Sequence, residues 1–412
     1  MRLLRRLVHM LALAGTALVL VVALGLVATQ TPWFRDWLRG YVVAQSRKVL
    51  AGELTIGRLG GNLFFGVDLE DVAVTLGGER VIAVRRLELD YSIVQLVSHG
   101  LVFDRLHLEA PRVLLRRTAE GWTLARLVKR EAEEAERLGP GRPVAIESVR
   151  IDDGEIRIEG AGGGAVRVPR RIAGLDVELA FHYRPVRYTV DVERLALRAL
   201  SPDLTVRALR GTIAVRGADL HFEGVELRTA RSALAVSGVI ERYAERPELA
   251  LRVRSERFSL PEFAPVVPAL DGRPLEPRFD VRLDGPLDRL GVTAGAAAEE
   301  MTLAADLTLD LTGPMRALRG DARVTALDLA PVVADPRFVS RITGHAGFAL
   351  VLPPGGLETL RGTWSFRGPE ARLAGYEAQD VDASGRIERG RIFFDGRAAA
   401  YGARATAKGV LA

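Results

Sequence analysis

Alternation of apolar and polar residues is the feature that most constrains this chain. From Thr302 to Pro314, leucine or alanine occupies every second position, and threonine or aspartate fills most of the positions between. Side chains of a β-strand point alternately to its two faces, so this stretch predicts a strand with one apolar and one polar face. Gly313-Pro314 is expected to end the strand, because proline cannot donate to a β-ladder and glycine permits a turn.

The pattern recurs along the chain. Gly-Pro follows a strand-like stretch at Gly285-Pro286, Gly313-Pro314 and Gly368-Pro369, at offsets of 28 and 55 residues. A period of roughly 28 residues accommodates two strands with their turns. The phrase Ala-Pro-Val-Val occurs at residues 264–267 and 330–333 and is expected to mark a short helix or a crossover. Because each unit of a regular array packs only on its neighbours, 412 residues can form a single array.

Composition argues against several classes of function. The 57 basic residues face 52 acidic residues, and both kinds are scattered singly along the strands. This is typical of a solvated face and argues against a phosphate-binding patch, although the sequence pI is 9.8. Aromatic residues make up only 6%, too few for a stacking platform on nucleic acid. The chain has no cysteine, which excludes disulfides and thiolate metal sites.

Motifs of catalysis and metal binding are missing as well. The sequence has no Gly-x-Ser-x-Gly, the nucleophile elbow of hydrolases. Six isolated histidines have no second ligand at metal-binding spacing: His9, His99, His107, His182, His221 and His345. Residues 160–164 are glycine-rich but lack the following Lys-Ser/Thr of a phosphate loop, so a flexible hairpin tip is expected. We therefore expect no enzyme activity, no cofactor and no metal site.

Asp152, Asp153 and Glu155 form the one acidic cluster that resembles a catalytic pair. They lie between two strand-like stretches, and Asp-Gly is a common hairpin turn. The segment 149–158 is therefore interpreted as a hairpin about Asp153-Gly154.

Residues 7–28 are 22 residues without a charge. As a helix they would be ~33 Å long, enough to cross a hydrocarbon core of ~30 Å, so a transmembrane helix is expected. Arg2, Arg5 and Arg6 precede it, and the positive-inside rule places residues 1–6 in the cytoplasm and the bulk of the chain across the membrane. The alternative is a cleaved signal peptide, whose apolar region is usually only ~7–15 residues long.

A second helix is expected over residues 31–50, where Thr31-Pro32 is typical of a helix start. Four of its aromatic residues gather on one side, opposite arginines: Trp33, Phe34, Trp37 and Tyr41. Clustered tryptophan and tyrosine just outside a membrane span prefer the lipid headgroup layer. The helix either lies on the membrane surface or caps the first strands, and the sequence leaves both interpretations open.

Three further segments follow. Residues 53–123 are expected to form an N-terminal β unit, residues 124–140 a helical insertion ended by Gly139-Pro140-Gly141, and residues 144–412 a repetitive β region. Between the strands of the first unit, residues 93–98 are expected to form one or two helical turns.

A sheet with one apolar face must place that face against something. After Leu138 the chain offers no helix long enough to cover it. Either the sheet folds over on itself as a sandwich, or it curls into a groove that is filled from outside, for which acyl chains are the obvious candidates beside a membrane. The residues predicted to line this face are Leu175, Val177, Leu179, Phe181, Val190, Val192, Leu249, Leu251, Val253, Phe279, Val281, Leu283, Leu307, Leu309 and Leu311.

A resemblance to a known family favours the groove. An arginine-rich start and a single span lead into Gly52-Glu-Leu-Thr-Ile-Gly-Arg-Leu-Gly-Gly61, Val67-Asp-Leu-Glu-Asp-Val-Ala-Val74 and Arg86-Leu-Glu-Leu-Asp-Tyr91. Phe103-Asp-Arg-Leu-His-Leu-Glu-Ala-Pro-Arg-Val113 and the Leu-x-Gly-Pro-Leu repeats follow. In this order the features resemble the AsmA-like superfamily, most closely the N-terminal part of its TamB branch, the inner-membrane subunits of the translocation and assembly module.

That resemblance implies a mainly β protein: an N-terminal transmembrane helix followed by an elongated, repetitive, half-open antiparallel β-sheet groove. It implies a single-pass protein of the bacterial inner (plasma) membrane with most of the chain in the periplasm, and membrane lipids as partners, carried between the inner and outer membranes. The alternative function it implies is that of an assembly or scaffold factor in autotransporter or outer-membrane protein secretion, working with an outer-membrane barrel protein of the TamA type. Family members are longer and end in a further domain, so a short homologue or a fragment is expected.

Overall fold

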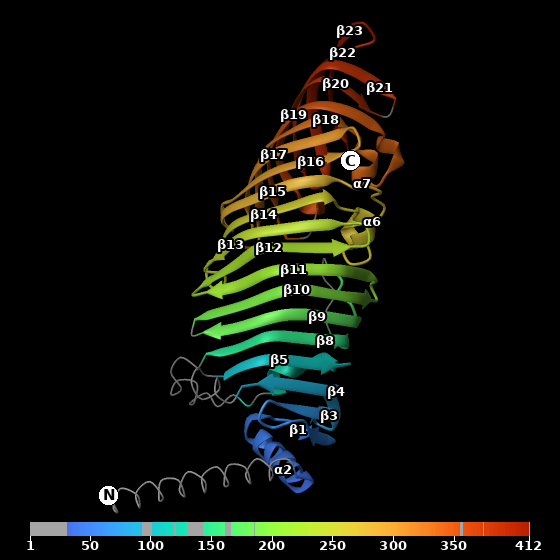
Figure 1. The fold of residues 1–412 in the computed structure, drawn as a ribbon. Coiled ribbons are helices and arrows are strands. Elements are labelled where there is room, and N and C mark those ends of the chain that lie inside the picture. The colour runs from blue at the N-terminus through green and yellow to red at the C-terminus, as the bar shows by residue number, and fades with distance from the viewer. Residues whose placement is uncertain are drawn as a thin grey trace, which may run out of the picture. The chain divides into compact units, whose positions relative to one another are not determined.

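The computed structural model describes residues 31–92, 101–118, 121–127, 129, 143–160, 166–184, 186–354, 357–373 and 375–411. The chain is mainly β, as predicted, with 67% of it in strands (Figure 1). Within the described part, no helix has the length and apolar character needed to span a membrane. The predicted span 7–28, the basic end 1–6, the helical turns 93–98 and the glycine-rich tip 161–164 lie outside the described residues.

The chain divides into two compact units. Unit 1 comprises Met1–Ala161 and Arg171–Pro185, and unit 2 comprises Gly162–Arg170 and Val186–Ala412. Unit 1 begins with α2 (Pro32–Val49) and continues through the following elements: β1 (Glu53–Thr55), β2 (Arg58–Gly60), β3 (Gly66–Leu76), β4 (Glu79–Tyr91), β5 (Leu101–Glu109), β6 (Arg112–Thr118), β7 (Gly121–Trp122), α4 (Thr123–Leu127), β8 (Val144–Glu159) and β9 (Arg171–Arg184).

The sheet of unit 1 is mixed, whereas the prediction was antiparallel throughout. Strands β5 and β6 continue one another across Ala110-Pro111; both pair antiparallel with β4 on one side and parallel with β8 on the other. Two parallel strands need a crossover much longer than a hairpin turn. The segment between β6 and β8 supplies it, which is why helical sequence interrupts the strands here. Of the predicted helix 124–140, residues 124–127 are helical in α4 and Lys129 is not, while residues 128 and 130–140 lie outside the described part.

Three residues of unit 1 have a left-handed backbone conformation, and the strand register aligns their positions across the sheet. Asp71 in β3, Ala110 between β5 and β6, and Asp153 in β8 have φ of 51°, 47° and 54°. Each shifts the alternation by one residue, so that Leu69 and Val72, for example, keep their side chains on the same face. The predicted hairpin about Asp153-Gly154 is therefore wrong, because β8 runs through from Val144 to Glu159. The two adjacent aspartates mark an irregularity inside one strand.

A small apolar core closes unit 1 beside α4. Leu127 is buried against Val74 and Val81, and Leu54, Leu76 and Ile82 pack around them. The backbone fixes this arrangement, since Ala51 N donates to Leu127 O at 2.8 Å and Lys129 N donates to Val49 O at 2.9 Å. The crossover therefore joins the end of α2 to the sheet.

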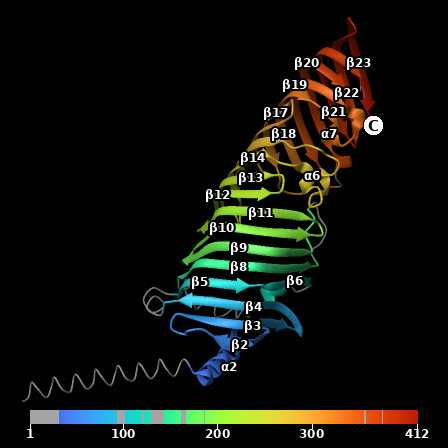
Figure 2. The same cartoon turned by 45° about the vertical axis from the view of Figure 1, so that its right-hand side comes forward.

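Unit 2 is an antiparallel meander in which each strand pairs with the next: β10 (Arg187–Leu200), β11 (Leu204–Arg216), β12 (Asp219–Thr229), β13 (Ala233–Glu241), β14 (Glu248–Arg257), β15 (Arg278–Pro286), β16 (Leu290–Ala298), β17 (Met301–Asp310), β18 (Arg316–Leu327), β19 (Ser340–Leu352), β20 (Arg361–Leu373), β21 (Tyr376–Glu388), β22 (Arg391–Ala400) and β23 (Ala403–Leu411). Figure 2 shows the successive strands of unit 2 lying side by side as in Figure 1. The predicted large antiparallel sheet is confirmed here.

Short helices stand where the meander of unit 2 is interrupted. α6 (Leu260–Phe263) and η1 (Pro268–Leu270) join β14 to β15, α7 (Ala330–Val333) and η2 (Pro336–Phe338) join β18 to β19, and η3 (Leu357–Thr359) precedes β20. The second Ala-Pro-Val-Val phrase is α7 itself, as predicted, and the first follows α6 directly.

Gly-Pro does not always end a strand. Gly313 has φ of 69° and lies in the turn after β17, as predicted. Gly368-Pro369, in contrast, lies inside β20, where the pairing with β19 shifts register between Thr343 and His345. Proline is tolerated within a sheet at such a bulge because no ladder hydrogen bond is needed there.

Candidate functional site

Side chains at paired positions of neighbouring strands lie on the same face of a sheet, so the register reveals what each face carries. In unit 2 one row of paired positions crosses all fourteen strands without a polar residue. We call it the central row: Val190, Ile213, Phe222, Gly238, Leu251, Leu283, Val292, Leu307, Gly320, Phe348, Trp364, Gly385, Phe394 and Gly409.

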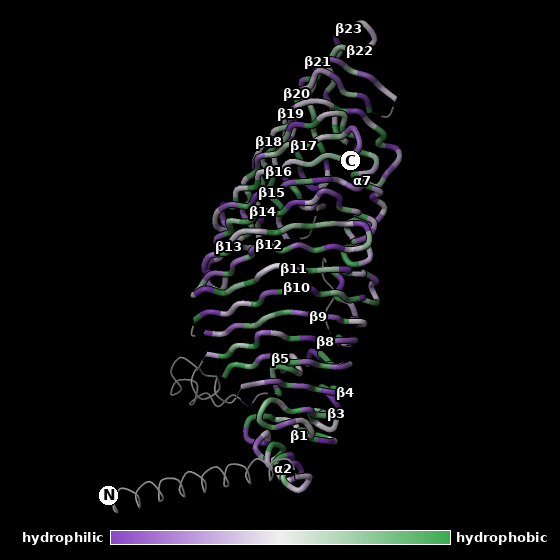
Figure 3. Tube along the Cα trace, in the orientation of Figure 1, coloured by the Kyte–Doolittle hydropathy of each residue, from purple (hydrophilic) through white to green (hydrophobic). Residues whose placement is uncertain are grey.

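A second apolar row runs beside it on the same face, from β12 to β23. Its members are Val225, Val236, Val253, Val281, Ala294, Ala305, Ala322, Ala346, Phe366, Ala383, Gly396 and Ala407. The adjacent row on the opposite face consists of Ser237, Arg252, Arg282, Thr293, Asp306, Asp321, Gly347, Ser365, Ser384, Asp395 and Lys408. The sheet of unit 2 therefore has one apolar and one polar face. Figure 3 shows the underlying alternation as green and purple segments along the strands.

The apolar face of unit 2 is only partly shielded from water. Its buried apolar residues are mostly small: Val192, Ala199, Leu290, Val292, Ala305, Val324 and Ala326. The large side chains of the central row, such as Leu251, Phe348 and Trp364, are half-buried. Leu303 and Ile392, on the same face, are each 37% exposed. The large apolar side chains of this face therefore remain partly exposed to solvent.

Unit 1 has its own apolar face, built in the same way. One row consists of Leu59, Leu69, Leu87, Leu108, Ile151 and Val177. The row beside it consists of Val67, Leu89, Leu106, Val149 and Leu179. Leu59, Val149 and Val177 are buried, and the others are half-buried. The left-handed residues Asp71, Ala110 and Asp153 lie where the apolar positions of their strands change between odd and even numbers, as from Leu69 to Val72.

Fourteen of the fifteen residues predicted to line the face lie in strands, and Leu311 does not. Leu175, Val177, Leu179 and Phe181 belong to β9 of unit 1, and the other eleven to unit 2. Leu251, Leu283 and Leu307 stand in the central row. Leu311 follows the last residue of β17 and is 41% exposed. Their role in binding remains a prediction.

Glycine and aromatic residues face each other across strands in the C-terminal part of unit 2, which the sequence analysis missed. Gly385 pairs with Trp364 on one side and Phe394 on the other, and Phe394 also pairs with Gly409. A Cβ at Gly409 would lie 2.9 Å from the Phe394 ring, so the ring occupies the space that a side chain would need. These glycines occupy positions that are apolar in the alternating pattern of their strands. Only the pairing of the strands shows which aromatic residue lies opposite each glycine.

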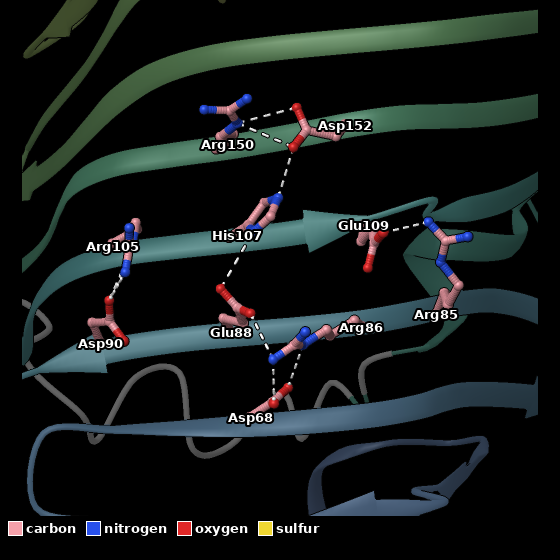
Figure 4. A network of polar contacts seen from close by, with 10 residues as sticks. All are labelled: Asp68, Arg85, Arg86, Glu88, Asp90, Arg105, His107, Glu109, Arg150 and Asp152. Carbon is pink, nitrogen blue, oxygen red and sulfur yellow. Dashed lines mark hydrogen bonds and ion pairs between the residues drawn. The ribbon is translucent and has the colours of Figure 1, made fainter. Parts of the chain in front are cut away.

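Charged residues form a network on the opposite face of unit 1 (Figure 4). His107 in β5 lies between two carboxylates: its Nε2 is 2.8 Å from Asp152 Oδ2 and its Nδ1 is 3.3 Å from Glu88 Oε2. Arg86 donates to both oxygens of Asp68, at 3.0 and 2.7 Å, and lies 3.0 Å from Glu88. Each partner neutralises the next across β3, β4, β5 and β8, which is typical of a solvated outer face and not of a catalytic pair.

Asp152 makes this network sensitive to acid. Burial would raise its pKa, but hydrogen bonds from His107 and Arg150 outweigh this effect and lower the pKa below the ordinary range. A carboxylate with a lowered folded-state pKa stabilises the fold above its unfolded pKa of about 3.9, and that contribution is lost as pH falls through the folded value.

Asp152→Asn is therefore expected to lower stability by about 0.2–1 kcal/mol at pH 7, the range for exposed pairs, and by less at about pH 3, below the unfolded pKa. Urea unfolding at both pH values, followed by the fluorescence of Trp122, measures the difference. Asp104→Asn is the matched control, because Asp104 lies in β5, the strand of His107, and has no ion-pair partner among the described residues. An equal loss for Asp152→Asn at both pH values would contradict this account.

The aromatic side of α2 is open to water. Trp33 is 75% exposed, Trp37 51% and Tyr41 50%, and the rings of Trp37 and Tyr41 stack with centroids 5.6 Å apart. Phe34 is half-buried. The other side of the helix contacts the start of the sheet, since Arg39 donates to Gly57 O at 2.6 Å. α2 thus caps the first strands and also presents aromatic residues outward, so the two interpretations of this helix are compatible.

Comparison of the chain with protein-family models, with curated proteins and with solved structures found no match. Within the described residues, no three His, Asp or Glu side chains gather in a way that would hold a metal ion.

Proposed function

We propose that the apolar faces of the two units form half-open grooves that hold and conduct the acyl chains of phospholipids. In this proposal the protein is anchored in the bacterial inner membrane by residues 7–28 and supports outer-membrane biogenesis by moving lipid through the periplasm. The observation that carries the proposal is the central row, fourteen strands without a polar residue whose large side chains are left half-buried.

Incomplete burial favours a groove over a closed sandwich. In a sandwich the two inner faces interdigitate at the packing density of a protein interior, which would bury large side chains such as Leu251 and Phe348. Here the buried positions are occupied mostly by alanine and valine. Monomeric soluble proteins rarely expose contiguous apolar patches beyond a few hundred Å² unless the patch has a function.

Hydrocarbon suits this face better than a polypeptide does. An extended peptide lying on the central row would place backbone amides against side chains that offer no hydrogen bond, and each unpaired polar group costs about 1–3 kcal/mol. An acyl chain has no such groups. The position of the anchor and the exposed aromatic side of α2 support a membrane as the source of the chains, with Trp33, Phe34, Trp37 and Tyr41 at the headgroup layer.

Photo-cross-linking in cells tests the proposal. A photoreactive phenylalanine analogue at Leu283 in the central row of the full chain is expected to yield phospholipid adducts, detected by mass spectrometry. The same analogue at Arg282, the next residue of β15 and on the opposite face, is expected to yield at least about tenfold fewer, because a charged row repels acyl chains. Equal adduct yields at both positions, or none at either, would refute lipid binding on this face.

A further inference from the structure

The central row is not uniform: in β20 to β22 it opens into a hollow. An open pocket of about 370 Å³ is lined by Trp364, Ile387, Ile392 and Phe394. Glycines stand in two adjacent rows of paired positions here. In the central row Gly385 pairs with Trp364 on one side and Phe394 on the other. In the row beside it Gly362 pairs with Ile387, which pairs with Ile392. From Leu251 to Leu307 in the same row, each strand contributes an aliphatic side chain instead.

From this geometry we propose that the hollow is a binding site for one acyl chain, a holding position within the groove. The inference rests on the proposed function and adds where a chain is held. The pocket volume lies within the range of about 300–1,000 Å³ that is usual for ligand pockets. Its lining consists of four apolar side chains, which an acyl chain would cover and so remove from water.

Glycine is required at position 385 for this arrangement. A Cβ at Gly385 would lie 1.9 Å from Phe393 O and 2.9 Å from the indole nitrogen of Trp364. Any larger residue would displace β22 or the Trp364 indole, so glycine at position 385 allows the Trp364 ring to lie close to β21, where it forms one wall of the hollow. Ile392, at 37% exposure, leaves the hollow accessible from water.

Tryptophan fluorescence provides the test, because Trp364 is one of only four tryptophans. The full chain with Trp33, Trp37 and Trp122 changed to Phe is reconstituted in phosphatidylcholine vesicles and titrated with dibrominated stearate, which quenches a tryptophan on contact. We expect saturable quenching of Trp364. Ile392→Asp, which places a carboxylate at the opening, and Ile387→Phe, which fills the hollow without charge, should each weaken binding at least about tenfold. Ser384→Asp, on the opposite face of β21, should change it less than about twofold.

A second reporter separates this inference from the proposed function. Leu307→Trp in a chain with all four native tryptophans changed to Phe places the only fluorophore in the central row, away from the hollow. Quenching at residue 307 without saturable quenching at Trp364 would overturn the holding site and leave the groove standing. If neither tryptophan is quenched, both are rejected.

Discussion

Gly362→Ala is expected to destabilise the C-terminal strands of unit 2 by about 3 kcal/mol or more, since two independent penalties add. Gly362 has φ of 149°, a conformation that is essentially restricted to glycine. A Cβ there would also lie 2.1 Å from Ala349 O, a backbone atom of the paired strand β19, so the two strands would have to separate. Urea unfolding followed by Trp364 fluorescence measures the loss, because Trp364 is two residues away in β20 and is the only tryptophan of unit 2.

Gly295→Ala in β16 is the matched control. Gly295 also lies inside a strand of unit 2, but a Cβ at that position meets nothing within 4 Å. Its substitution should change stability by less than about 1 kcal/mol, in either direction. If both variants unfold at the same urea concentration, the close approach of backbones at Gly362 does not contribute to stability. Gly238 and Gly320 share the geometry, with φ of 127° and 152°, so the same result is expected at β13 and β18.

The faces of the sheet were predictable because alternation is a local property. Thr302 to Asp310 reads as one amphipathic strand in the sequence and is one in β17. The predicted lining residues Val253, Val281 and Leu283 likewise face the same side as Leu307. Burial of apolar side chains selects the register, since a slip of one residue would turn the apolar set outward.

The pairing partners were not predictable from local patterns. The parallel pairing of β8 with β5 and β6 depends on contacts between residues about 43 positions apart, as between Leu101 and Val144, and the alternation of each strand is the same in either direction. Asp152-Asp153-Gly154 looks like a hairpin turn in sequence, but the parallel neighbour holds both halves of β8 in line. Two adjacent polar residues inside an alternating stretch, as at Glu70-Asp71, are the signal that points to such a left-handed residue within a strand.

The hollow of the central row was missed for a related reason. Gly385 and Trp364 lie on consecutive strands, and their pairing appears only when β20 and β21 are aligned. An alternating strand that carries glycine at an apolar position is consistent with a bulge, a bend or an aromatic neighbour. Only the register distinguishes these three.

Leu307→Asp is expected to reduce the transfer of lipid along unit 2 at least about tenfold, because an unpaired carboxylate against hydrocarbon costs several kcal/mol and 1.4 kcal/mol corresponds to a factor of ten. Photoreactive probes at Ile213 in β11 and Phe348 in β19 lie in the central row on either side of β17. If chains are conducted along the row, Leu307→Asp should leave phospholipid adducts on the side where lipid enters and remove them on the other. Thr308→Asp is the matched control: it adds the same charge to the opposite face of β17, where Thr308 pairs with Arg319, and both probes should still give adducts. Unchanged adduct yields at both probes in Leu307→Asp would show that lipid does not pass along the central row, and unit 2 would then bind each chain locally.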